Sequence, residues 1–190
     1  LIANHEPVML NLQPSLLPRY GQQDPWTLLV QSVGLEADTG RVLVERVAIG
    51  PDKREVQRGQ LVDQLHSDHL ISRAVNGRYV FLPWPIRIQG GEPLIHVEPS
   101  EDRWFEKEWA KQISADAASD TLTDLVPIAA AIEQEDGARA VVIGSGGWML
   151  SWAADRAMSV GGDQIAMVNP GNSELLLAAV TWLSGNDDWI

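Results

Sequence analysis

An Asp-Gly pair between two short apolar runs is the feature that most limits what this chain can fold into. The pair is Asp136 and Gly137, and the runs cover residues 127–134 and 138–144. Asp and Gly tolerate the positive φ angles of a tight type I′ turn, so the arrangement is a strong signal for a β-hairpin. The alanines at 129–131 favour a helix by intrinsic propensity alone. We nevertheless predict a hairpin, whose second strand at residues 138–144 is buried.

Other regular elements are expected on both sides of this hairpin. Apolar runs with alternating or β-branched residues predict strands at residues 4–12, 41–49 and 93–97. Residues 78–88 also have an extended composition, but Pro83 and Pro85 exclude a central strand and favour an edge position. Spacing and capping residues predict helices at residues 25–34, from Ser100 to about 113, and from Asn172 or Ser173 to 184. Loops are expected at residues 50–59 and 115–124.

This loose alternation of strands and helices, with some antiparallel pairing, predicts an α/β fold. A chain of 190 residues with 45% hydrophobic residues is long enough to bury a core. We expect one domain that spans residues 1–190.

The charge and cysteine content exclude several classes of function. Fourteen Lys and Arg face 26 Asp and Glu, a net charge of −12, which repels nucleic acids and anionic lipid headgroups. The absence of cysteine removes disulfides, thiolate nucleophiles and cysteine metal sites, and it suits an extracytoplasmic compartment. No apolar run reaches membrane-helix length, and no signal peptide is visible. Because the chain begins at Leu1 rather than Met, we expect it to be a fragment of a larger protein.

A glycine-rich turn at residues 144–147 follows the predicted second hairpin strand. It matches no catalytic or phosphate-binding motif, because Ile143 replaces the first glycine of a nucleophile elbow and Met149 replaces the third glycine of a dinucleotide-binding loop. A Walker lysine is also absent. We expect a structural turn, and a hydrolase that uses Ser145 remains an alternative.

Histidines and tryptophans are the other residues that could bind a metal or a ligand. His66 and His69 are three residues apart and could share a helix face with a metal, but no third ligand stands out, so we expect no metal and no cofactor. Eight tryptophans could form a sugar-binding surface, since an indole ring is a flat stacking platform. Their positions on apolar stripes favour core packing for most of them.

Two loops are the expected site of any ligand. Ligands of open α/β sheets bind beyond the carboxyl ends of the strands, where backbone N–H groups and helix N-termini converge. The loops at 144–148 and 169–174 fit that position, and their candidate binding residues are Ser145, Gly146, Trp148, Asn169 and Asn172. We expect Ser145 and Asn172 to lie in one concave site. The alternative is that the glycines only form tight turns.

Several segments resemble a known family when they are taken in order. The segments are HLIS at 69–72, SEDRWFE at 100–106, VPIAAAIE at 126–133, ARAVVIGSGGW at 138–148, GNSELLL at 171–177 and TWLSGNDD at 181–188. Together they resemble the gliding-motility-type auxiliary (substrate-binding-like) domain of uncharacterised ABC transport systems. The chain departs from the family pattern at Ser145 and Gly147, where the family carries acidic residues.

The resemblance implies a Rossmann-like or glutamine-amidotransferase-like open sheet, here an incomplete fragment of that domain. It also implies an extracytoplasmic location, an anchoring membrane helix outside this chain, and an ABC transporter permease and ATPase as partners. The expected function is therefore that of a non-catalytic auxiliary domain that binds a protein partner or an unknown ligand. A carbohydrate-binding module and, less favoured, a serine hydrolase are the alternatives. Amidotransferase chemistry needs a cysteine that this chain lacks.

Overall fold

The computed structural model describes residues 6–114, 121–161 and 164–190. Its central sheet has four strands in the order β1-β12-β11-β8. These strands are β1 (Val8–Asn11), β12 (Arg139–Ile143), β11 (Val126–Glu133) and β8 (Glu92–Val97). β1 runs parallel to β12, whereas β11 is antiparallel to both β12 and β8. The fold is therefore α/β with mixed parallel and antiparallel pairing.

The predicted Asp-Gly hairpin is confirmed as the pair β11–β12. Gly137 turns the chain at a φ of +83°, and the Asp136 carboxylate accepts a hydrogen bond from the Ala138 N–H at 3.0 Å. The alanines at 129–131 form a strand and not a helix because each is at most 1% exposed. Layers on both faces of β11 bury them, and this tertiary burial outweighs helix propensity.

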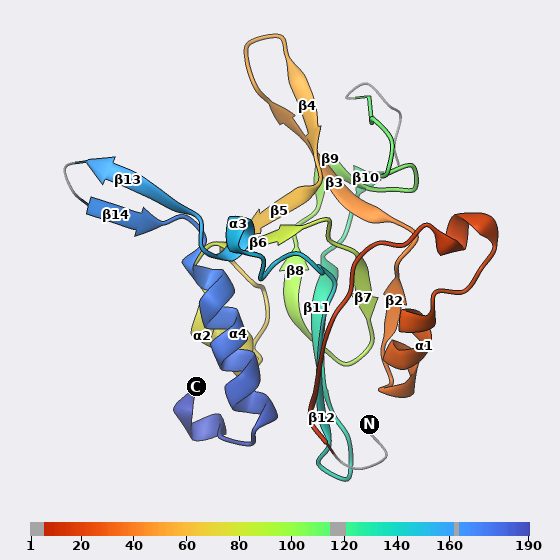
Figure 1. The fold of residues 1–190 in the computed structure, drawn as a ribbon, viewed down its shortest axis with the longest axis vertical. Coiled ribbons are helices and arrows are strands. Elements are labelled where there is room, and N and C mark those ends of the chain that lie inside the picture. The colour runs from red at the N-terminus through yellow and green to blue at the C-terminus, as the bar shows by residue number, and fades with distance from the viewer. Residues whose placement is uncertain (1–5, 115–120, 162–163) are drawn as a thin grey trace.

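A second sheet lies beyond the end of the first and has the order β10-β9-β3-β4 (Figure 1). Its strands are β10 (Thr121–Leu122), β9 (Ser100–Glu106), β3 (Val42–Ala48) and β4 (Arg54–Gln57). The prediction of β3 is confirmed. Three predictions are wrong: the loop at 50–59 contains β4, the helix from Ser100 is strand β9, and the loop at 115–124 contains β10, with its residues 115–120 outside the described part of the chain.

The error at β9 has a physical cause. Ser100 does accept a local hydrogen bond, from the Asp102 N–H at 3.2 Å, as a capping residue would. The following residues instead pair with β3, where Trp104 lies opposite Val44, and the Trp104 side chain is buried. This partner is about sixty residues away in sequence, so local capping signals could not reveal it.

Three pairs of short strands complete the sheet structure. They are β2 (Glu36–Asp38) with β7 (Arg87–Gln89), β5 (Gly59–Val62) with β6 (Val80–Pro83), and β13 (Ala157–Gly161) with β14 (Gln164–Met167). The extended segment at 78–88 thus forms two short strands in two-stranded sheets, with Pro83 at the end of β6. The hairpin β13–β14 projects from the body of the molecule (Figure 1).

Four α-helices are described: α1 (Pro25–Ser32), α2 (Leu70–Val75), α3 (Ser151–Ala154) and α4 (Pro170–Leu183). The short 3-10 helices η2 (Leu17–Tyr20) and η3 (Asp187–Trp189) lie near the two ends of the chain. The predicted helices α1 and α4 are confirmed, but α4 begins at Pro170, with Asn169 as N-cap in place of Asn172 or Ser173. Proline is favoured in the first helical turn, because an N–H there has no helical partner. No described helix is long and apolar enough to cross a membrane.

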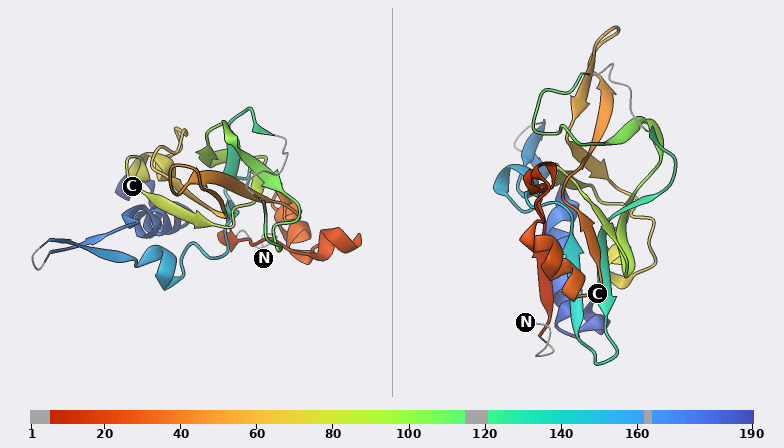
Figure 2. Two further views of the ribbon diagram at one scale, coloured as in Figure 1. Left: turned by 90° about the horizontal axis from the view of Figure 1, so that it is seen from above. Right: turned by 90° about the vertical axis from the view of Figure 1, so that its right-hand side faces the viewer.

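Helices cover both faces of the central sheet (Figures 1 and 2). On one face, side chains of α2 and α4 join one buried cluster with β11 and β12, which includes Ile71, Leu175 and Val141. On the other face, Val30 of α1 packs in a second cluster with Val142. β11 and β12 supply side chains to both clusters, so the predicted buried strand and the helix packed on the sheet are confirmed.

The two faces of α4 give a direct test of this packing. Leu175 is fully buried, whereas Leu177 of the same helix is 64% exposed. Leu175→Ala should lower the free energy of unfolding by about 2–5 kcal/mol, through lost burial and a new cavity. Leu177→Ala should change it by less than about 0.5 kcal/mol. Urea denaturation of both variants measures the difference, and equal effects would mean that α4 packs through another face.

Candidate functional site

The structure places Ser145 and Asn172 against the same strand. The Ser145 hydroxyl donates to the Pro83 carbonyl at 2.6 Å. The Asn172 carboxamide accepts from the Phe81 N–H at 2.8 Å and donates to the Phe81 carbonyl at 3.0 Å and the Trp148 carbonyl at 2.5 Å. Both side chains therefore reach β6, and both are at most 1% exposed.

The polar side chains of the other predicted ligand residues also form hydrogen bonds within the protein. The Trp148 indole N–H donates to the Asn11 side chain at 2.7 Å, and the Asn169 side chain donates to the Ala153 carbonyl at 2.8 Å. Trp148 and Asn169 are buried, and Gly146 is exposed. The two predicted loops thus converge, but the polar side-chain groups bind the protein itself. Ligand binding by this set remains a prediction.

The glycines beside this set permit close backbone contacts. A Cβ added to Gly144 would lie 2.4 Å from the Ile86 carbonyl oxygen, and one added to Gly171 would lie 2.7 Å from the Tyr79 carbonyl oxygen. Neither position can hold a side chain without movement of the backbone, which is the turn and packing role expected of these residues.

The tryptophans divide into buried and exposed groups. Trp109 and Trp148 are buried, while Trp84 is 45% exposed and meets the Trp109 ring edge-on at a centroid distance of 5.7 Å. Trp26, Trp152 and Trp189 are exposed on α1, α3 and η3. No ring contact joins any two of these three side chains.

The two candidate metal ligands have separate roles. His69 is the N-cap of α2, and His66 precedes that helix with a φ of +51°. The Nε2 atom of His66 lies 3.0 Å from a Glu98 carboxylate oxygen. Within residues 6–114, 121–161 and 164–190, no group of three or more His, Asp or Glu residues is placed to hold a metal ion.

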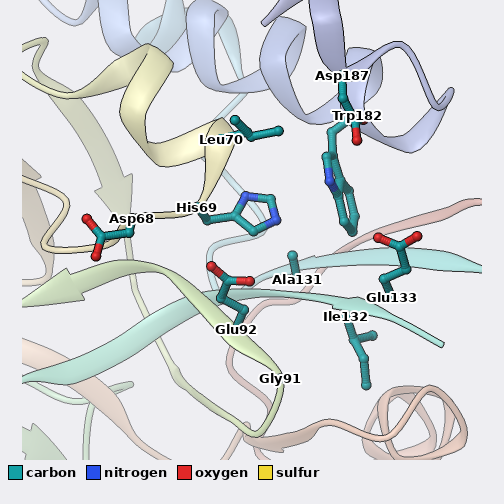
Figure 3. A pocket seen from close by; sticks show the side chains of 10 residues that line it. All are labelled: Asp68, His69, Leu70, Gly91, Glu92, Ala131, Ile132, Glu133, Trp182 and Asp187. Atoms are coloured by element: carbon teal, nitrogen blue, oxygen red, sulfur yellow. The ribbon is translucent and has the colours of Figure 1, made fainter. Parts of the chain in front are cut away.

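A pocket in front of His69 is lined by acidic side chains and a tryptophan that the sequence motifs did not predict to lie together. It has a volume of about 550 Å³ and lies between α2, α4, η3 and the ends of β8 and β11 (Figure 3). We name it the His69 pocket. Its lining residues are Asp68, His69, Leu70, Gly91, Glu92, Ala131, Ile132, Glu133, Trp182 and Asp187.

His69 is held in this pocket by contacts on two sides. Its Nδ1 atom accepts a hydrogen bond from the Ile71 N–H at 3.2 Å. Its ring meets the Trp182 ring edge-on, with centroids 5.0 Å apart and planes at 70°. The residue is 7% exposed. In the neutral imidazole the proton must then lie on Nε2, since Nδ1 is an acceptor.

Arg139 binds three residues that line the pocket, Asp187, Trp182 and Glu133. Its guanidinium donates to both carboxylate oxygens of Asp187 at 2.6 and 2.9 Å and to the Trp182 carbonyl at 2.7 Å. It also lies over the Trp182 ring at 4.7 Å and within 3.3 Å of a Glu133 carboxylate oxygen. The bidentate ion pair fixes η3 to β12 beside α4.

The charges around the pocket shift the pKa values of three groups. Burial lowers the pKa of His69, and the carboxylate of Glu92 opposes that shift only in part. The hydrogen bond from Arg139 lowers the pKa of Asp187, and the same contact raises the pKa of Arg139. At neutral pH the pocket therefore combines the ionised carboxylate of Asp187 with an uncharged imidazole N–H donor. This arrangement is suited to binding by hydrogen bonds and charge.

Sequence reasoning missed the pocket although it named most of its segments. His69, Glu133, Trp182 and Asp187 all lie in the segments that carry the family resemblance. Their convergence was not visible, because they come from a helix cap, a strand end, a helix and the chain's last turn. Glu92 and Asp68 lie outside those segments.

Comparisons with known proteins bear on the fold alone. The chain is similar to a solved structure described as "mmIFT52 N-terminal domain", with 15% sequence identity and a TM-score of 0.53. The match covers 93% of this chain and 64% of that chain, so this chain spans less than two thirds of that protein's length. No protein-family model matches the sequence, and no curated protein matches it.

The lowered pKa of His69 predicts a pH-dependent stability. The ordinary pKa is 6.5. Between that value and the lower folded-state pKa, the unfolded chain binds more protons than the folded chain, so stability falls as the pH falls. His69→Asn keeps an N-cap acceptor and removes the titrating ring. The charged groups that act on this ring are the carboxylates of Glu92, Glu133 and Asp187 and the guanidinium of Arg139.

Urea denaturation of both proteins between about pH 7.5 and about pH 5 measures this effect. The wild type should lose more stability than His69→Asn over that range, whatever the difference at neutral pH. Because the other histidines are common to both proteins, their contributions cancel. Parallel profiles would show that His69 is not held in its neutral form.

Proposed function

We propose that this chain is a non-catalytic auxiliary domain of an ABC-type transport system, and that it binds a protein partner or ligand in the His69 pocket. The observation that carries the proposal is the convergence of separate segments of the family resemblance. Of the ten lining residues, seven belong to these segments: His69, Leu70, Ala131, Ile132, Glu133, Trp182 and Asp187. We therefore infer that these short motifs, which are far apart in the sequence, together form one binding pocket.

The fold is compatible with this assignment. An open sheet with one parallel strand pair and helices on both faces supports a Rossmann-like or amidotransferase-like relationship, which we propose as the finer class. In this proposal the domain is extracytoplasmic and is anchored by a membrane helix outside the chain. Its partners are the permease and ATPase subunits, and the net charge of −12 disfavours nucleic acid.

The contacts of Ser145 weigh against the hydrolase alternative. A serine nucleophile needs a base that takes its proton and an open path to the substrate. The Ser145 hydroxyl instead donates to a backbone carbonyl, and the residue is 1% exposed. A ligand could not reach this oxygen without movement of β6 or the turn.

The carbohydrate alternative retains one favourable observation, the exposure of four tryptophans: Trp26, Trp84, Trp152 and Trp189. A sugar that stacks on Trp84 should quench tryptophan fluorescence in the wild type and lose that effect in Trp84→Ala. No ring contact joins any two of these four, and separate rings offer less stacking area than a platform of several rings. For this reason we place the transport-associated role first.

Site-specific photocross-linking in the source cells tests the proposal. A photoreactive residue in place of Leu70, on the rim of the pocket, should cross-link a permease or ATPase subunit of an ABC system. The matched control is Tyr20, which is 75% exposed on η2 and is not among the residues that line the pocket. Transporter subunits captured equally from both positions, or from neither, would contradict the proposal.

A further inference from the structure

We infer that the His69 pocket binds a basic side chain, an arginine guanidinium or a lysine ammonium, together with a neighbouring carbonyl of the same partner. This inference rests on the proposed function and names the chemistry of what the pocket receives. Three observations carry it: an unpaired carboxylate, an imidazole N–H that is open to the pocket, and an internal cation whose contacts are already made within the protein.

The unpaired carboxylate is Glu92. Among the described residues, the Asp187 and Glu133 carboxylates are ion-paired with Arg139, whereas the Glu92 carboxylate has no ion pair or hydrogen bond. The Asp68 carboxylate is also unpaired, but it points away from the His69 ring (Figure 3). Figure 3 shows the Glu92 and Glu133 carboxylates on opposite sides of the space in front of the His69 ring, with Ala131 between them. A cation in that space would neutralise charge that the fold leaves uncompensated.

The donor without a partner is Nε2 of His69. The residue is 7% exposed, its ring projects into the pocket, and Nδ1 is already occupied by the Ile71 N–H. No nitrogen or oxygen atom of a described residue accepts a hydrogen bond from Nε2. The Nε2 atom is not fully buried, so its N–H is open to the pocket and can donate to a ligand that supplies an acceptor. A peptide carbonyl beside a basic side chain supplies one.

Arg139 shows that this environment stabilises a guanidinium. It lies over the Trp182 ring and is held by Asp187, but its contacts are all internal. It therefore leaves the Glu92 carboxylate and the Nε2 atom of His69 without a partner from the described residues. The pocket's charge, four carboxylates against one guanidinium, favours a cationic occupant and disfavours an anionic one.

The probe for this inference is N-acetyl-arginine amide, which combines a guanidinium with peptide carbonyls. Titration of the wild-type chain should shift the NMR signals of the His69 ring and the Trp182 indole in a saturable way. N-acetyl-citrulline amide has the same shape without the charge and should bind more weakly. High salt should also weaken binding of the arginine compound, because it screens the exposed Glu92.

Three variants locate the interaction. Glu92→Gln should weaken binding about two- to fivefold, the range for loss of a solvent-exposed ion pair. His69→Asn keeps the helix cap, removes the Nε2 donor and should also weaken binding, as reported by the Trp182 signal. Glu101→Gln removes an exposed carboxylate that does not line the pocket and should leave the affinity unchanged.

Several results would overturn the inference. They are equal affinity for the arginine and citrulline compounds, no saturable shift, unchanged affinity in Glu92→Gln, or saturable binding of glucosamine without binding of the arginine compound. If cross-linking from Leu70 succeeds while these titrations fail, only the ligand chemistry is wrong. If both fail, the pocket's assigned function is wrong as well.

Discussion

Burial of β11 on both faces is the constraint on which the rest of the structure depends. The strand pairs with β12 on one side and β8 on the other, and its alanines leave room for helical layers above and below. Small side chains allow those layers to approach closely, which maximises the apolar area removed from water. The same strand ends at Glu133, so the central packing of the protein also positions one wall of the His69 pocket.

The pocket is built where this sheet meets α2, α4 and η3. The N-cap of α2 is His69, although Ser or Asp would cap a helix equally well. The histidine cap places an imidazole beside the sheet. At the other end, the bidentate contact of Arg139 with Asp187 ties the chain's last turn to the sheet. Structural contacts thus hold the His69 ring that we assign to binding, which reduces the entropy lost when a partner docks.

The parts of the fold that the sequence predicts are those determined by local residues. The Asp136-Gly137 turn, the alternating strand β3 and helix α4 each carry their own signal within a few residues. Strand β9 is predicted wrongly as a helix because its pairing with β3 is non-local. Strand β4 is predicted wrongly as a loop because charged residues are equally typical of an exposed hairpin and of a loop. At the site, the sequence identified His69 and Trp182 separately. It could not show that they are in contact, nor that Ser145 and Asn172 serve the backbone of β6.

The tautomer and pKa of His69 test the central claim of this account most directly. Nitrogen NMR of the imidazole, followed through a pH titration, measures both in the intact chain. We expect a proton on Nε2 at neutral pH, because Nδ1 accepts from the Ile71 N–H, and a pKa of His69 below the ordinary 6.5. A proton on Nδ1, or a pKa above that value, would contradict the geometry from which both the pocket's chemistry and its proposed ligand are derived.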